Sequence, residues 1–354
     1  MVTLEELQRN VYDKDNISKL EAKFELIEQT SDSRVSIYNG RYPLQPFRDD
    51  QRGVYGGEFV SQGVLAAWKT LSDPELTPHS LHGYFVKAGS NNSVVRWEVE
   101  NVSDGRNFAN RLLRAFQTHT DVLVFTLQVS FTKNNDGVKR REVYEEQLAK
   151  GVENIRSIPF SFQKVPNPLF YQFKDNIDSL PSIEHTHEFM THAFTPDAFR
   201  SPKVLNHETI GSRQLGLFAK INEDPSLATD KIKSKYTAAL YLSDSLFITL
   251  VMSAVGVAIS EEEKNFFRVS LDHAVYFHDS NFDARDWLFI DFKFPSMGND
   301  RALVLCNFYT LDGRLVFSVN QEFLCFFPKK IIDKSNSLHE KYLAAQNSQE
   351  SAKL

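Results

Sequence analysis

Asp244 is a carboxylate on the apolar stripe of a helix that the sequence predicts from about Lys231 to Val257. A carboxylate that faces a core loses hydration unless it is paired or hydrogen-bonded, and such a group can accept a proton in acid–base chemistry. The other interpretation is an Asp that caps a nearby turn or faces a solvated gap. Spacing alone does not decide between them. The stripe is formed by apolar residues three and four positions apart, which are Leu240, Phe247, Ile248, Val251 and Val255.

Gln321 is a second polar side chain on an otherwise apolar face. It lies in a predicted strand, 315–327, in which alternate residues share a face. A buried amide must find hydrogen-bond partners, so Gln321 either holds groups in a site or bonds a neighbouring strand or helix end. The apolar residues on its face are Phe317, Val319, Phe323 and Cys325.

Ser270 is a candidate whose orientation the sequence leaves open. Simple alternation along its strand places it on the same face as Asp272 and on the opposite face from His273, although a β-bulge would change this. A Ser-Asp-His catalytic triad formed within this one strand is therefore not favoured. No Gly-x-Ser-x-Gly elbow of a serine hydrolase occurs in the chain. The other interpretation is an ordinary strand hydroxyl.

Gly56 and Gly57 begin a second apolar helix, predicted from Gly57 to Leu71. Glycines there let a ligand approach the free N–H groups of the helix start, which stabilise negative charge; a tight turn is the plainer explanation. His79 and His82 lie three residues apart in a predicted strand and do not share a face. Together with the lack of a Cys-x-x-Cys motif, this spacing predicts no metal site and no cofactor.

An internal repeat shows which elements must position these residues. An offset of 192 aligns Leu123 with Leu315 and Phe116 with Phe308, and it also aligns Tyr84-Phe85 with Tyr276-Phe277. In each half, one long apolar helix precedes several strands. The predicted strands are 80–86, 93–102, 107–117 and 122–133 in the first half, and 267–277, 287–296, 301–309 and 315–327 in the second.

This order predicts an α+β fold with two tandem units, each an antiparallel sheet wrapped around a long central helix. We predict a first unit at 1–133, a partly ordered linker at 134–206, a second unit at 207–330 and a polar tail at 331–354. The linker is rich in Pro, Asn, His and charge, with little periodicity. At the same offset Gln321 corresponds to Val129, which predicts one active site per chain.

The bulk composition excludes some functions. The net charge of −6 over 354 residues implies no basic face for nucleic acid. The longest apolar stretch, from Leu246 to Ile259, is too short for a membrane span. Cys306 and Cys325 lie in apolar strands, which is typical of buried, reduced thiols.

The motifs resemble the type II acyl-CoA thioesterases, the bacterial enzymes and their peroxisomal relatives, over most of the chain from about 53 to 328. One departure is Glu58, where the family commonly has Gln. The matching motifs are Tyr55 to Gln62, His79 to Phe85 and Asp104 to Phe108 in the first half, and Tyr241 to Asp244, Ser270 to His273 with Tyr276 to His278, and Ser318 to Glu322 in the second.

The resemblance implies a double-hotdog fold and hydrolysis of fatty acyl-CoA by a water that Asp244, Ser270 and Gln321 hold. It also implies a substrate-binding role for Gly56, Gly57 and His79, and association into a homodimer. No covalent intermediate and no metal are required. Two alternatives are a hotdog-fold enoyl-CoA hydratase, whose usual Asp-x-Asn-Pro-x-His arrangement is missing here, and a non-catalytic acyl-CoA-binding protein.

The sequence ends in Ala352-Lys353-Leu354, a variant of the Ser-Lys-Leu peroxisomal address. A polar segment precedes it and would leave the terminus free to enter an import receptor. We therefore expect the protein in the peroxisomal matrix.

Overall fold

The computed structural model describes residues 4–32, 34–48, 53–155, 157–185, 189–258 and 266–351. Ala352, Lys353 and Leu354 lie outside these ranges, so the peroxisomal address remains a prediction. The strands are β1 (Leu26–Ser31), β2 (Val35–Gly40), β3 (Thr77–Phe85), β4 (Val95–Asp104), β5 (Phe108–Gln117), β6 (Val122–Thr132), β7 (Ser182–His185), β8 (Met190–Phe194), β9 (Leu215–Ile221), β10 (Arg268–Ser270), β11 (Asp272–Phe277), β12 (Leu288–Gly298), β13 (Arg301–Thr310) and β14 (Leu315–Cys325).

The α-helices are α1 (Leu4–Leu7), α2 (Lys19–Lys23), α3 (Gly56–Lys69), α4 (Gly137–Ala149), α5 (Pro168–Phe173), α6 (Pro196–Phe199), α7 (Lys231–Leu242), α8 (Phe247–Ala254) and α9 (Lys329–Ser351). Short turns of other helix types are η1 (Gln8–Tyr12), η2 (Ile177–Ser179), η3 (His207–Ser212) and η4 (Pro225–Leu227).

The described strands form one antiparallel sheet that runs through both halves of the chain, in the order β1-β2-β4-β5-β6-β3-β11-β14-β13-β12-β9-β8-β7, with β10 paired to β14. At the offset of 192, β3, β4, β5 and β6 correspond to β11, β12, β13 and β14. The two halves meet where β3 pairs with its own counterpart β11, with Ala274 opposite His82. The α+β fold with two tandem units is thus confirmed.

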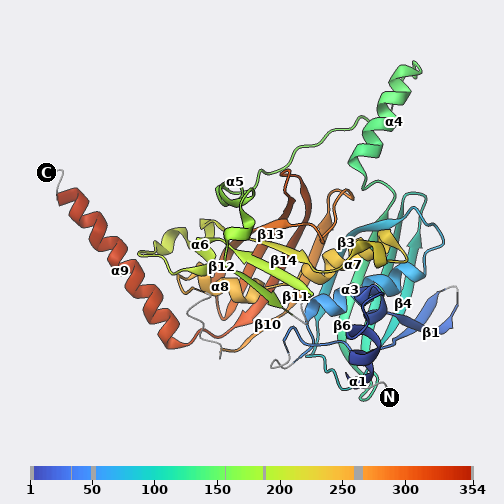
Figure 1. Cartoon of the computed structure of the whole chain (residues 1–354), viewed down its shortest axis with the longest axis horizontal. Coiled ribbons are helices and arrows are strands. Elements are labelled where there is room, and N and C mark those ends of the chain that lie inside the picture. Colours follow the sequence, from blue (N-terminus) through green and yellow to red (C-terminus); the bar gives the residue numbers. More distant parts are fainter. Residues whose placement is uncertain are drawn as a thin grey trace.

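The central helices α3 and α7 lie side by side on the inner side of the sheet (Figure 1). Twelve of the fourteen residues of α3 are buried, and the helix packs against α7 and strands β3 to β6. An apolar helix of this kind is stable only inside a core. A single large cluster of buried apolar side chains includes residues of both halves, so the junction between the halves is part of the core.

The segment 134–206, which we interpreted as a linker, contains more structure than expected. Helix α4 has no buried residue and projects from the body (Figure 1). Strands β7 and β8, in contrast, extend the sheet of the second half beyond β9. All five residues of β8 are buried, so its sequence lacks the alternation of polar and apolar residues by which a strand is recognised. The unit boundaries stay a prediction.

One helical segment in the described part of the chain, Lys231–Ala254, is long and apolar enough to cross a membrane, with a mean hydropathy of 1.4. Of the 18-residue stretch that has this hydropathy, 78% is buried inside the protein. Such burial is typical of a core helix.

Candidate active site

Asp244 lies at a break between two helices. The sequence predicts one helix from 231 to 257, whereas the structure has α7 and α8 with four residues between them. Leu246 adopts a left-handed conformation there, with φ of 63°, which costs energy for a branched side chain and is found most often at functional sites. No Gly or Pro marks the break, so the hydrophobic pattern runs through it unchanged.

The start of α3 holds the carboxylate of Asp244. The backbone N–H groups of Gly56 and Gly57 donate to it, and a Cβ atom at Gly56 would collide with the carboxylate. Only glycine therefore fits at this position. The N–H groups that the sequence suggested for the substrate are used by Asp244 instead, so first-half backbone positions the second-half carboxylate.

Burial raises the pKa of Asp244 to about 7, even though the side chain of Gln321 and the two glycine N–H groups lower it. Removal of water from the charged form costs more free energy than these hydrogen bonds return. A carboxylate with this pKa is well matched to accept a proton near neutral pH.

A β-bulge gives Ser270 its orientation. Ser270 is opposite Phe323 on β14 and Ala274 is opposite Asn320, so four steps on one strand match three on the other. The extra residue is Leu271, whose N–H donates to the carbonyl of Glu322 (2.9 Å). Because of it, Ser270 and His273 share the inner face of the sheet. The simple alternation considered in the sequence analysis is therefore wrong at this point.

Gln321 connects the site residues. Its Nε2 donates to Oδ1 of Asp244 (2.8 Å) and to Oγ of Ser270 (2.6 Å). Both amide hydrogens are used in this way, and the hydroxyl hydrogen of Ser270 is left to donate to another group. The structure thus brings together Asp244, Ser270 and Gln321, the three predicted catalytic residues.

His273 is a site residue that sequence reasoning missed. Its Nδ1 lies 2.7 Å from Oε1 of Gln321, and its Nε2 lies 2.9 Å from Oγ of Ser243. Burial lowers the pKa of His273 to about 4, so the ring is neutral at physiological pH. We assign the proton to Nδ1, because the amide oxygen it faces can only accept. His273 then fixes the amide of Gln321 with its NH₂ toward Asp244.

An apolar cavity of about 650 Å³ opens at Asp244 and Ser270. Its wall comes from both halves, and two cations, Lys87 and Arg268, are part of it. The aromatic residues of the wall include Phe47, Tyr55, Phe59, Phe85, Phe247 and Phe267.

The predicted substrate-binding residues divide into two groups. Gly56 lines the cavity, and Gly57 contributes its N–H to Asp244. His79 is not among the cavity residues; its Nδ1 lies 3.4 Å from Oγ of Ser130 and its ring contacts Phe108. His79 is the extra residue of the corresponding bulge in β3, where Pro78 is opposite Phe131 and Ser80 is opposite Ser130. We therefore no longer place His79 at the substrate.

Glu58, the departure from the family's usual Gln, forms an ion pair with Lys23 of α2, and both side chains are fully buried. Its other oxygen accepts from the N–H of Gln45 (2.8 Å). Burial lowers the pKa of Lys23, but the carboxylate of Glu58 and two nearby phenols outweigh this, and the pKa is raised. The pair fixes the first turn of α3, next to the glycines that hold Asp244. Within the described residues, no group of three or more His, Cys, Asp or Glu could hold a metal ion.

Comparison with known proteins places the chain in a family. The N-terminal domain model of the acyl-CoA thioesterases matches residues 45–132, and the C-terminal domain model matches residues 174–325. The chain belongs to the acyl-CoA thioesterase family. The resemblance found in the sequence is thus confirmed, and the C-terminal match begins inside the segment that we had interpreted as a linker.

Two curated relatives of the chain carry the name of an acyl-CoA thioesterase or thioester hydrolase. The chain is 25% identical over 343 residues to the peroxisomal acyl-coenzyme A thioester hydrolase 1 of Saccharomyces cerevisiae, covering 86% of this chain and 94% of the relative. It is 27% identical to acyl-coenzyme A thioesterase 8 of Rattus norvegicus, covering 81% of this chain and 83% of the relative.

Solved structures show the double-hotdog fold. The acyl-CoA thioesterase II TesB2 of Mycobacterium marinum superimposes with a TM-score of 0.60 at 24% identity, covering 88% of this chain and 98% of that one. A hot dog fold protein of Alicyclobacillus acidocaldarius gives a TM-score of 0.56 at 14% identity, with coverage of 88% and 99%.

Proposed function

We propose that the chain hydrolyses fatty acyl-CoA thioesters with a water molecule that Asp244 binds and deprotonates, in a site that Ser270 and Gln321 complete. The observation that carries this proposal is the Gln321 amide, which joins a buried carboxylate to a serine hydroxyl at the base of an apolar cavity. The names of the yeast and rat relatives support the thioester substrate.

In this mechanism Asp244 is the general base. It takes a proton from the water as the water oxygen bonds to the thioester carbonyl carbon. The Ser270 hydroxyl, which accepts from Gln321, donates its own hydrogen to the developing oxyanion. The tetrahedral intermediate then breaks its carbon–sulfur bond, and the proton held by Asp244 passes to the departing CoA sulfur. His273 acts through Gln321 and is a positioning residue.

Lys87 and Arg268 would bind the phosphate groups of CoA. Lys87 is exposed and Arg268 is half-buried, and both belong to the cavity wall that also contains Asp244. A cation at the solvent side of an apolar cavity attracts phosphate oxygens without a high desolvation cost. The acyl chain would then occupy the apolar interior.

The test is release of free thiol from acyl-CoA by wild type and by Asp244→Asn. We expect kcat to fall at least about 100-fold, the lower range for loss of a general base, with the fold retained. The matched control is Asp175→Asn, an exposed carboxylate paired with its neighbour Lys174, which should keep wild-type turnover. Near-normal turnover by a folded Asp244→Asn protein would refute the mechanism.

The same assay, with an enoyl-CoA as an additional substrate, addresses the two alternatives. A hydratase needs a histidine free to reach the substrate, but both ring nitrogens of His273 face protein groups. We therefore expect no change in enoyl-CoA absorbance. No thiol release from any acyl-CoA would favour the non-catalytic binding protein.

We also propose that this activity serves peroxisomal fatty acid metabolism, which the name of the yeast relative supports. Deletion of Ala352, Lys353 and Leu354 from a protein with an N-terminal fluorescent tag should leave it in the cytosol. Unchanged peroxisomal fluorescence would show that another signal directs import.

A further inference from the structure

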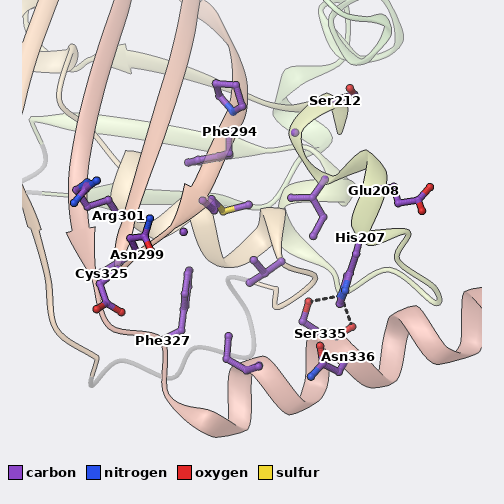
Figure 2. A pocket seen from close by; sticks show the side chains of 18 residues that line it. His207, Glu208, Ser212, Phe294, Asn299, Arg301, Cys325, Phe327, Ser335 and Asn336 are labelled. Carbon is purple, nitrogen blue, oxygen red and sulfur yellow. Dashed lines mark hydrogen bonds between the residues drawn. The ribbon is translucent and has the colours of Figure 1, made fainter.

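A second cavity of about 900 Å³ lies between α9 and the ends of β12 and β14. Figure 2 shows Ser335 and Asn336 on α9 facing it on one side, with Arg301, Asn299 and Cys325 opposite. We call it the α9 cavity. Its apolar lining consists of Ile210, Val255, Phe294, Met297, Phe327 and Ile332.

The α9 cavity and the active-site cavity share a wall. Phe266 lines the active-site cavity and Phe327 lines the α9 cavity. Their rings are stacked, with centroids 5.7 Å apart. This pair of aromatic rings therefore forms part of the wall between the two spaces.

Helix α8 runs from one cavity to the other, so its length measures how far apart they are. Residues Phe247 and Ile248 at its start line the active-site cavity, and Val255 at its end lines the α9 cavity. The helix has eight residues, which corresponds to about 12 Å at 1.5 Å per residue. An extended carbon chain advances roughly 1.2 Å per bond, so an acyl chain of about ten carbons covers this distance.

The charges around the α9 cavity favour an apolar occupant over a phosphate group. The charged side chains of the lining are Glu208, Asp300 and Arg301, a net negative set. Arg301 already donates to the carboxylate of Glu322 (3.1 Å). The ring of His207 is held by Ser335, with Nε2 3.1 Å from both the hydroxyl and the carbonyl oxygen (Figure 2).

We propose that the α9 cavity receives the distal end of long acyl chains, whose thioester lies at Asp244, and that a long chain displaces the Phe266–Phe327 contact to reach it. This inference rests on the proposed thioesterase function. An aromatic contact of this kind corresponds to a factor of about two to ten in binding. Each methylene that leaves water returns a factor of about four, so two or three methylenes beyond the ring pair offset the loss.

The test fills the α9 cavity without touching the active site. Gly298 lines the α9 cavity, and no atom lies within 4 Å of a Cβ built on it. Gly298→Phe therefore adds a ring at the cavity lining without a clash at its Cβ, and Gly298→Ala is the matched control. Ile332→Trp, at a lining position on α9 that is 41% exposed, fills the cavity from the other side should Gly298→Phe fail to fold.

The measurement is kcat/KM for octanoyl-CoA and palmitoyl-CoA. We expect each filled variant to lower the palmitoyl value at least about tenfold, as several methylenes stay in water. The octanoyl value and both values of Gly298→Ala should stay within about twofold of wild type. An equal effect on both substrates, no effect on either, or a wild type that hydrolyses only octanoyl-CoA would overturn this inference and leave the thioesterase function standing. A wild type inactive on both would instead refute the proposed function.

Discussion

On the inner face of the first half, Pro78, Leu81 and Val129 occupy the positions that Ser270, His273 and Gln321 occupy in the second half, at the same offset of 192. Leu81 and Val129 are opposite each other and fully buried. Both halves have the bulge that turns the first two positions inward.

The comparison distinguishes backbone features that both halves share from polar side chains that only the second half has at these positions. The bulge and the strand order occur in both halves, while the polar groups occur in one. What the first half supplies is the start of α3, whose glycine N–H groups hold Asp244. We infer one active site per chain, assembled across the two halves.

The largest expected effect comes from giving the second half the residue of the first. Gln321→Val removes the amide between Asp244 and Ser270, and kcat for thiol release should fall at least about 100-fold. His273→Leu, the other exchange, should lower kcat about 10- to 100-fold, because Gln321 loses the group that orients it. KM should change little in both. If His273→Leu keeps full kcat, the positioning role is refuted.

The pH dependence of activity and of stability should report the carboxylate of Asp244, which belongs to the second half. Because the pKa of Asp244 is about 7, kcat/KM should fall about tenfold per pH unit below 7 and reach a plateau above it. The folded state holds this proton more tightly than the unfolded chain, so the stabilisation is complete below about pH 4 and is lost as the pH rises through 7. Thermal melts at pH 5 and pH 8 check the sign: Asp244→Asn should show a smaller fall in Tm than wild type.

A smaller effect on turnover is expected from the first-half ion pair. Lys23→Met leaves the carboxylate of Glu58 buried and unpaired, which should cost about 3–5 kcal/mol of stability and lower kcat roughly tenfold by loosening the start of α3. The double variant Lys23→Met/Glu58→Gln should recover much of both. Lys14→Met, an exposed residue nearby, is the control. A lower Tm with unchanged kcat in Lys23→Met would limit the pair to a structural role.

The smallest effect on activity is expected from the reverse exchange. Val129→Gln places an amide in the first half, where Leu81 offers no partner and Glu58, the one carboxylate of α3, is paired with Lys23. Stability should fall by about 1–3 kcal/mol from the unsatisfied amide, while thiol release stays at the wild-type level. Activity in an Asp244→Asn/Val129→Gln protein would contradict the single-site interpretation.

Sequence reasoning found the residues whose signal lies within one element. Asp244 and Gln321 each interrupt an apolar face of a helix or strand, and the repeat predicted the same succession of one helix and several strands in each half. Ser270 and His273 could not be oriented, because the bulge depends on how three strands pair. The use of the glycine N–H groups by Asp244 depends on the packing of α3 against α7, and the break at Leu246 has no Gly or Pro to mark it.

The pairing of β3 with β11 has a consequence for folding. The glycines that hold Asp244 belong to the first half and Asp244 belongs to the second, so neither half contains a complete site by itself. Contacts between segments so distant in sequence form late, because a long loop must close first. During refolding, the return of thioesterase turnover should therefore report the docking of the two halves, later than the return of helical circular dichroism.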